Sequence, residues 1–380
     1  MIRLLLFWSS IGLILYSYFL FPFLTFLRGK FRQQPYRSQD ITPKVSMIIA
    51  AYNEAEGIGA KLDNILSLDY PQECLEVVVA SDGSNDGTDE IVRGYAAQRV
   101  RLLSLPRQGK APALNSAVAA STGEILVFSD ANSMYAPDAI RAIVRPFADP
   151  EVGGVAGNQV YLEEEQKDAT SGEKSYWMFD RKLKQSQSQA GNAISATGAI
   201  YAIRRSLFQT VPDGVTDDFV TSTRVILQGY RLVFAPDAIA YEPIAKSSSR
   251  ELGRKERVIT RGLRSVWTNR ALLNPLRYGY YSVQVFSHKI LRRLAVFPLI
   301  ALFLVSPLLW WRGSIYRLAA LAQFMFYGFA LIGALFDDTR IGRQKQFALP
   351  FFFCLVNLAS LRAALNIMRG QRIDRWETRR

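Results

Sequence analysis

The sequence predicts an α/β domain flanked by transmembrane helices. From Lys44 onward, short apolar runs rich in β-branched residues alternate with segments of helical period, which is typical of a parallel sheet covered by helices. Long uncharged runs stand near both ends of the 380-residue chain, and each is about long enough to cross ~30 Å of hydrocarbon. Polar residues directly follow three of the predicted strands, where such sheets bind ligands.

The apolar runs are Leu4 to Leu27, Leu294 to Trp311 and Leu318 to Phe336, with a weaker fourth at Phe347 to Leu361. A cleaved secretory signal is the alternative for the first run, but the run is long and no small-residue cleavage pattern follows it. Buried core helices are the alternative for the later runs. Paired tryptophans and flanking arginines around the second run favour a membrane interface instead.

Charge is concentrated next to the second apolar run. The chain has 46 Lys and Arg against 33 Asp and Glu, a formal charge of +13. The segment from Lys246 to Arg293 contains twelve basic residues and only two acidic ones, Glu251 and Glu256, which gives it a local charge of +10. This position favours membrane lipids and a pyrophosphate as partners. No recognisable nucleic-acid-binding module accompanies the segment, so we expect no nucleic acid partner.

The positive-inside rule places Arg28, Lys30 and Arg32 on the cytoplasmic side, together with the domain that follows. We therefore expect an integral protein of the cell (inner) membrane whose α/β domain is cytoplasmic. Three later crossings would export the basic tail, residues 369–380. Because Asn357, Arg362 and Asn366 also weaken the last run as a span, the sequence favours a re-entrant or interfacial segment there.

These patterns divide the chain into five parts, namely an anchor (1–30), the α/β domain (40–246), basic interfacial helices (247–293), a transmembrane region (294–368) and the basic tail (369–380). Cys74 and Cys354 are the only cysteines, so no disulfide framework exists, as a reducing compartment predicts. His288 is the single histidine. It supports no metal site built from histidines.

Four strands and three helices are legible in the domain. The strands are predicted at Val45–Ala50, Glu76–Ala80, Val100–Ser104 and Glu124–Ser129, and the helices at Ile58–Leu68, Asp89–Gln98 and Ala111–Ala120. Ala51, Tyr52, Asn53 and Glu54 follow the first strand, Asp82 opens a polar loop after the second, and Asp130 and Asn132 follow the fourth. Their common position predicts a ligand site.

Two of these motifs have structural alternatives. The segment Asp82 to Thr88 resembles the start of an EF-hand loop, but the twelfth position is Arg93 instead of a bidentate Glu, which argues against calcium. A plain turn remains open, since Asp, Asn, Ser and Gly suit turns. Asp130 and Asn132, two residues apart, can hold a hard cation against a diphosphate. Alternatively, Asp130 can be a helix N-cap, a role for which Asp138 competes at the next helix.

Two further motifs combine charge with helical spacing. Thr216, Asp217 and Asp218 precede an apolar-periodic helix, so they can cap that helix, supply a general base at its start, or do both. Arg254, Arg257 and Arg261 share one helical face. That face can clamp a leaving diphosphate or adhere to anionic lipid.

In this order, the four motifs closely resemble glycosyltransferase family 2, especially the membrane-bound branch with hyaluronan, chitin, cellulose and poly-N-acetylglucosamine synthases. The resemblance extends from about Val45 to Gly262. It implies the nucleotide-sugar-binding α/β fold called GT-A. The segment Ala196 to Arg205 also resembles the family's strand next to the acceptor.

The resemblance implies roles for individual residues. A donor nucleotide would be bound by Ala51, Tyr52, Asn53, Glu54, Asp82, Lys110 and Asp130. A divalent cation, Mg or Mn, would be held by Asp130 and Asn132. Asp218 would be the catalytic base, and the diphosphate and acceptor would be met by Asp217, Arg254, Arg257 and Arg261.

Two departures from the family pattern limit what it implies. Asn132 gives the cation site a neutral oxygen donor, which should weaken the site without abolishing it. Where processive synthases carry Gln-x-x-Arg-Trp, this chain has Arg254, Arg257 and Val258. The missing Trp puts processive polymerisation in doubt, whereas Arg257 still suits a diphosphate.

The sequence therefore predicts an inverting transferase that moves a sugar from a nucleotide-sugar, by family expectation a UDP-sugar, to a polysaccharide acceptor at the membrane. Transfer of one sugar to a lipid acceptor is the second hypothesis. A catalytically silent partner that binds nucleotide-sugar, alone or within a secretion complex, is the third. The joint presence of Asp82, Asp130 and Asp218 argues against the silent partner.

Overall fold

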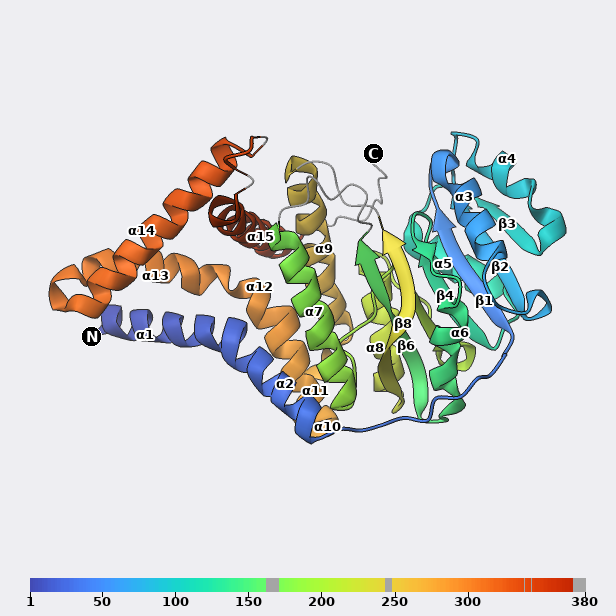
Figure 1. The fold of residues 1–380 in the computed structure, drawn as a ribbon, viewed down its shortest axis with the longest axis horizontal. Coiled ribbons are helices and arrows are strands. Elements are labelled where there is room, and N and C mark those ends of the chain that lie inside the picture. Colours follow the sequence, from blue (N-terminus) through green and yellow to red (C-terminus); the bar gives the residue numbers. More distant parts are fainter. Residues whose placement is uncertain (162–170, 243–247, 338, 343, 372–380) are drawn as a thin grey trace.

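The computed structural model describes residues 1–161, 171–242, 248–337, 339–342 and 344–371. Most of the basic tail predicted at 369–380 lies outside these ranges. The described residues form one sheet in the order β3-β2-β1-β4-β7-β6-β8-β5, with helices on both faces and a group of long helices to one side (Figure 1). The strands are β1 (Val45–Ala51), β2 (Leu75–Asp82), β3 (Val100–Leu105), β4 (Ile125–Asp130), β5 (Met134–Tyr135), β6 (Val152–Tyr161), β7 (Tyr201–Arg204) and β8 (Arg231–Glu242).

The four strands predicted from the sequence are confirmed, and they pair in parallel with one another. The rest of the sheet is mixed, which corrects the expectation of a parallel sheet throughout. Strand β7 runs antiparallel to both β4 and β6, and β5 runs antiparallel to β8. The alternation of strands and helices that predicts parallel pairing ends after β4, so it carried no information on the direction of later strands.

Alternate residues of the central strands enter two separate cores. Val45, Met47 and Ile49 of β1 face one core and Ile48 and Ala50 face the other, as the period of two in a strand requires. One core is covered by α3 (Ala55–Leu66), α4 (Thr88–Arg93) and α6 (Ala139–Val144), and the other by α5 (Lys110–Ala120) and α8 (Asp217–Leu227). The central strands are therefore continuous apolar runs in the sequence, because both faces of the sheet are covered by helices.

The helices at the two ends of the chain lie together. The first consists of α1 (Ile2–Leu15), η1 (Tyr16–Leu20) and α2 (Phe21–Phe31), which form one candidate span of 30 residues. Two more candidates are α14 (Ser314–Leu335) and α15 (Lys345–Met368). Figure 1 shows α1, α13 (Val296–Leu308) and α14 extending away from the sheet. The predicted first and third runs are thus long and apolar enough to cross a membrane.

The second predicted run begins earlier than expected and is bent. The segment Tyr280–Leu294 meets α13 at an angle of 47°. It is made of α11 (Tyr280–Gln284), η7 (Val285–Leu291) and α12 (Arg292–Leu294). The segment and α13 are long and apolar enough for a membrane span only when they are counted together. The break at Ala295 has a local cause in Pro298. A proline has no N–H to bond the carbonyl four residues earlier, here that of Leu294, and its ring crowds that carbonyl.

The fourth run is one unbroken helix, α15, of 24 residues. It is long and apolar enough to be a candidate span, and two of the polar residues predicted to weaken it have partners on another helix. The re-entrant or interfacial interpretation stays a prediction. The Asn366 side-chain amide donates to Glu256 at 2.6 Å, and Arg362 lies 3.8 Å from the same carboxylate. Glu256 belongs to α9 (Ser248–Thr268), so α15 packs against the helix that carries the predicted arginine face.

Candidate active site

A stacked pair of side chains stands beyond the ends of β1 and β2. The Arg107 guanidinium carbon lies 3.4 Å from the ring centroid of Tyr52. Arg107 also forms an ion pair with Asp82, whose carboxylate accepts the backbone N–H of Gln108 at 2.7 Å and of Gly109 at 2.9 Å. The buried Asp82 therefore fixes the loop that presents Arg107 to Tyr52. Arg107 was not predicted from the sequence, because it has no signal beyond its place before Gly109 and Lys110.

The loops after β1 and β2 are joined by side-chain hydrogen bonds. Asn53, which adopts a left-handed backbone (φ 53°), accepts the N–H of Asn85 at 2.9 Å. The N–H of Glu54 donates to Thr88 at 2.9 Å. Asn53 and Glu54 thus fix the two loops to each other at the carboxyl edge of the sheet. The side chain of Ala51 is fully buried in the core. Any contact of Ala51 with a ligand would have to come from its backbone.

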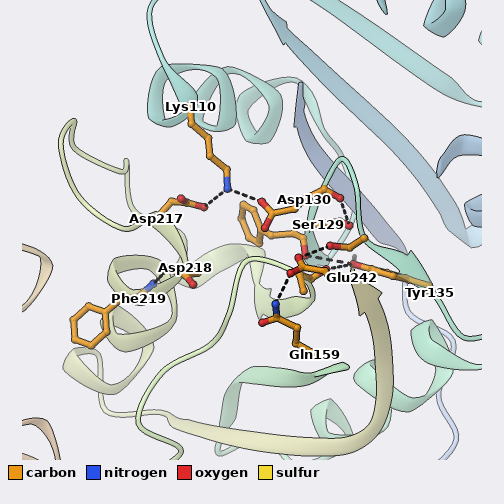
Figure 2. A network of polar contacts seen from close by, with 12 residues as sticks. Lys110, Ser129, Asp130, Tyr135, Gln159, Asp217, Asp218, Phe219 and Glu242 are labelled. Carbon is orange, nitrogen blue, oxygen red and sulfur yellow. Dashed lines mark hydrogen bonds and ion pairs between the residues drawn. The ribbon is translucent and has the colours of Figure 1, made fainter. Parts of the chain in front are cut away.

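Lys110 connects two acids that are far apart in the sequence. Its ammonium lies 2.7 Å from Asp130, at the end of β4, and 3.3 Å from Asp217, at the start of α8 (Figure 2). Burial lowers the pKa of Lys110, but Asp130 and Asp217 outweigh it and raise that pKa above its ordinary value. Lys110 therefore stays charged. It begins α5, so its cation is held at a fixed position.

Asp218 lies beside this cluster, with its carboxylate accepting the N–H of Phe219 at 2.6 Å. Burial and then the charge of Asp217 raise the pKa of Asp218 to about 6, against the opposing charges of Lys110 and Lys289. A carboxylate with a raised pKa holds an incoming proton better, as a general base requires. Thr216 is the N-cap residue of α8 and makes no side-chain cap hydrogen bond, while Asp217 and Asp218 lie in the first turn. The position of the motif at a helix start is therefore confirmed.

Two carboxylates give this edge of the sheet its capacity for a cation. Burial and the nearby charge of Asp130 raise the pKa of Glu242, the last residue of β8, to about 7. A divalent cation would relieve this repulsion. No three His, Cys, Asp or Glu side chains converge on a metal-sized site within the described ranges. The residues present thus fit a cation that takes one or two carboxylates from the protein and other oxygens from a diphosphate.

A buried lysine supports the turn that follows Asp130. Lys61 of α3 is fully buried, donates to the Ser133 carbonyl and lies 3.9 Å from the ring centroid of Tyr135. Ser133 in turn donates its hydroxyl to Glu242 at 2.9 Å, and Gln159 donates to the other oxygen of that carboxylate. Figure 2 shows Glu242 and Gln159 below Asp130. Nothing local in the sequence marks Lys61, Gln159 or Glu242.

The remaining predicted residues are Asn132 and the three arginines predicted on one helical face. Asn132 is exposed. Arg254, Arg257 and Arg261 all belong to α9, which confirms their helical spacing, and Arg254 lies within electrostatic range of Glu242. The structure therefore brings one end of the arginine row to the acidic edge of the sheet.

Comparison with known proteins agrees with this geometry. Residues 46–211 match the family model described as Glycosyl transferase family 2. A poly-beta-1,6-N-acetyl-D-glucosamine synthase of Staphylococcus epidermidis is 28% identical over 204 residues, which are 52% of this chain and 49% of that protein. The synthase of Staphylococcus aureus (strain COL) is 26% identical over 228 residues, 58% of this chain and 55% of that protein. The chain thus spans about half the length of the curated relatives that it matches.

One solved structure matches along almost the whole chain. It is a mannosyltransferase from Pyrobaculum calidifontis in complex with GDP-Man and Mn²⁺, with a TM-score of 0.71 and 26% identity. The match covers 97% of this chain and 100% of that one. The likeness therefore includes the long helices as well as the sheet.

Proposed function

Because residues 46–211 form a glycosyl transferase family 2 domain, we propose that this glycosyltransferase moves a hexose from a nucleoside diphosphate sugar to a saccharide acceptor at the membrane. The names of the curated relatives support a growing polysaccharide as the acceptor. A UDP-sugar is the first choice of donor, from the resemblance to polysaccharide synthases. A GDP-sugar is the second, because the mannosyltransferase of similar structure holds GDP-Man.

The observation that carries the proposal is the position of Lys110 between Asp130 and Asp217, next to Asp218. In the reaction, the Asp218 carboxylate takes the proton of an acceptor hydroxyl. The hydroxyl oxygen attacks the anomeric carbon from the face opposite the diphosphate, the bond from that carbon to the diphosphate breaks, and the configuration inverts. The departing charge falls where the Lys110 ammonium and the arginine row of α9 stand, which is where stabilisation has most effect.

A divalent cation, Mg²⁺ or Mn²⁺, would be held by Asp130 with Asn132 or Glu242. When bound, it neutralises negative charge on the leaving diphosphate. The Mn²⁺ in the mannosyltransferase complex supports this assignment. Tyr52 and Arg107 would hold the nucleobase, since planar cations and aromatic rings both stack on bases.

The chain is organised as an anchor (1–30), a cytoplasmic transferase domain (40–246), interfacial helices (247–293) and a transmembrane region (294–368), a division that we propose from charge and hydropathy. The candidate spans support a membrane protein. The cytoplasmic side is supported by the basic residues that follow the first span. Nucleotide-sugars are then available on the side where the domain lies.

The test is a comparison of Asp218→Asn with Asp213→Asn in full-length protein reconstituted in native lipid. Asp213 is an exposed carboxylate five residues away, so it controls for the loss of one charge. A panel of radiolabelled nucleotide-sugars is offered with Mn²⁺ or Mg²⁺, and products are sized. We expect Asp218→Asn to lower kcat by about 10²- to 10⁴-fold while nucleotide-sugar binding persists. Equal losses of binding and turnover would remove Asp218 from the role of base.

Transfer of a single sugar to a lipid acceptor is the second candidate. It is favoured by Val258, which stands where processive synthases carry Trp, and by the whole-length match to a mannosyltransferase. Product size separates the two, because a synthase yields long chains and a lipid transferase yields one added sugar. Binding of nucleotide-sugar without any transfer would point to a silent partner.

A further inference from the structure

A second charged cluster lies where α7 (Ser171–Gln189) meets the bent pair of helices. In Figure 1, α7 lies between the sheet and α12. The cluster consists of Asp180, Arg181 and Lys184 from α7, His288 and Lys289 from η7, and Arg292 and Arg293 from α12. Asp180 lies 3.3 Å from His288 and 3.8 Å from Arg292. This carboxylate is therefore already engaged by two of the basic groups.

Two lysines of the cluster lie within electrostatic range of the reaction centre as well as of Asp180. Lys184 is 8% exposed, and both its ammonium and that of Lys289 lie within electrostatic range of Asp218. The Lys289 ammonium lies 5.4 Å from the ring centroid of Phe219, the residue after Asp218. Among the described residues, neither lysine has a hydrogen-bond or ion-pair partner. The two cations thus flank the proposed base from its membrane-helix side.

Such an arrangement has an energetic cost when no ligand is bound. Two like charges that are largely withdrawn from water repel each other and lose hydration. Burial lowers the pKa of Lys184, although Asp180 and Asp218 oppose this. Asp180 is shared with His288 and Arg292, and the charge of Asp218 disappears when it takes a proton, so these two carboxylates do not balance both lysines throughout the reaction. An anion of the substrate would stabilise the pair throughout the reaction.

Lys110 lies in a different part of the site from Lys184 and Lys289. It is paired with Asp130 and Asp217, on the side of the proposed donor diphosphate. Lys289, by contrast, belongs to Tyr280–Leu294, the first arm of the bent candidate span. The two lysines therefore stand between the base and the helices that approach the bilayer, where an acceptor carried by a lipid would enter.

We infer that Lys184 and Lys289 bind the phosphate of a lipid-linked acceptor whose sugar hydroxyl faces Asp218. This inference rests on the proposed function, favours its second candidate, a lipid acceptor, and names that acceptor by its phosphate. The phosphate takes no part in bond making, since the hydroxyl still attacks the anomeric carbon and its proton still passes to Asp218. The lysines position the acceptor by its anion.

The test measures binding of farnesyl phosphate to full-length protein in nanodiscs of neutral phosphatidylcholine. Mn²⁺ and a saturating nucleoside diphosphate fill the donor side, so only the remaining phosphate site is probed. Farnesol and phosphatidylglycerol compete in parallel, the first without a phosphate and the second with an ordinary headgroup. The variants are Lys184→Gln, Lys289→Gln and Lys184→Arg, and the matched control is Lys182→Gln, an exposed lysine on the same helix.

We expect saturable binding that farnesol and phosphatidylglycerol fail to displace. Each Gln variant should weaken it about tenfold or more, Lys184→Arg should retain most of it, and Lys182→Gln should match the original protein. Displacement by farnesol or by phosphatidylglycerol would overturn the inference, and so would Gln variants that shift only the pH dependence of turnover, since the lysines would then serve Asp218 alone. Nucleotide-sugar binding by the same proteins, measured without added nucleoside diphosphate, separates these results from a failure of the proposed function, in which that binding would be missing.

Discussion

The guanidinium of Arg107 lies 3.4 Å from the centre of the Tyr52 ring, and the loop that carries it is fixed by the buried carboxylate of Asp82. We expect Tyr52→Leu to weaken uridine or guanosine diphosphate binding by about 2- to 30-fold, the equivalent of ~0.5–2 kcal/mol for a cation–ring contact. Calorimetric titration with both nucleotides checks this. Tyr278→Leu, which breaks the Arg277–Tyr278 contact at 5.4 Å, is the control. Equal weakening in the two variants would argue against a base-stacking role.

The pH dependence of turnover should report Asp218. A general base works only when deprotonated, and the pKa of this group is raised to about 6 by burial and by Asp217. We therefore expect kcat to rise with pH through about 6 and to level off above it. Asp217→Asn removes a charge that raises this pKa, so the acidic limb should move to lower pH. Rate profiles from pH 4.5 to 8 measure the shift, and a limb that stays in place would contradict it.

Gly198 provides a way to disturb the cation site without changing a charge. A Cβ atom at Gly198 would lie 2.6 Å from a carboxylate oxygen of Asp130, so Gly198→Ala must displace that carboxylate. After chelation, we expect this variant to need about tenfold more Mn²⁺ for half-maximal nucleotide-sugar binding, a change of ~1.4 kcal/mol. The control is Gly59→Ala in α3, where the added atom meets only ordinary contacts at 3.7 Å. An unchanged requirement for Mn²⁺ would exclude Asp130 as a ligand.

Lys61 should make stability depend on alkaline pH. Burial lowers its pKa to about 7 from the ordinary 10.5, so between these values the unfolded chain binds more protons than the folded protein. Stability then rises as pH increases through this window. We expect Lys61→Met to flatten the rise of Tm between pH 7 and 10 and to weaken cation binding through Ser133. Exposed Lys182→Met should leave the slope alone, and a parallel slope in Lys61→Met would refute the assignment.

The strand-end motifs were predictable because two regular features coincide in them. Short apolar runs located β1, β2 and β4, and parallel strands bring their carboxyl ends to one edge, so Tyr52, Asp82 and Asp130 had to lie near one another. The structure also brings Lys110 and Asp217 together, at 3.3 Å. The pattern did not predict the structural role of each side chain. Asp82 fixes a loop, and Ala51 packs in the core.

The residues that sequence analysis missed all depend on packing between distant elements. Lys61 occupies an apolar face of α3 and is stabilised by Ser133 and Tyr135, which lie more than seventy positions along the chain. Lys184 and Lys289 meet near Asp218 only because α7 and η7 are neighbours in the fold. The bend before α13 is different, since Pro298 was visible in the sequence and could have predicted it.

The contacts of Glu256 with Arg362 and Asn366 tie the arginine row to α15 at a fixed register. A helix cannot slip along its neighbour by one turn, ~5.4 Å, without losing both contacts. If α15 crosses the bilayer, as its length and composition allow, its height there sets the position of the arginine row, and the rate of sugar transfer should depend on lipid thickness. Turnover should pass through an optimum as acyl chains are lengthened, because mismatch shifts or tilts a spanning helix. A turnover rate that did not change with acyl chain length would indicate that the sheet, and not α15, fixes the position of the arginine row.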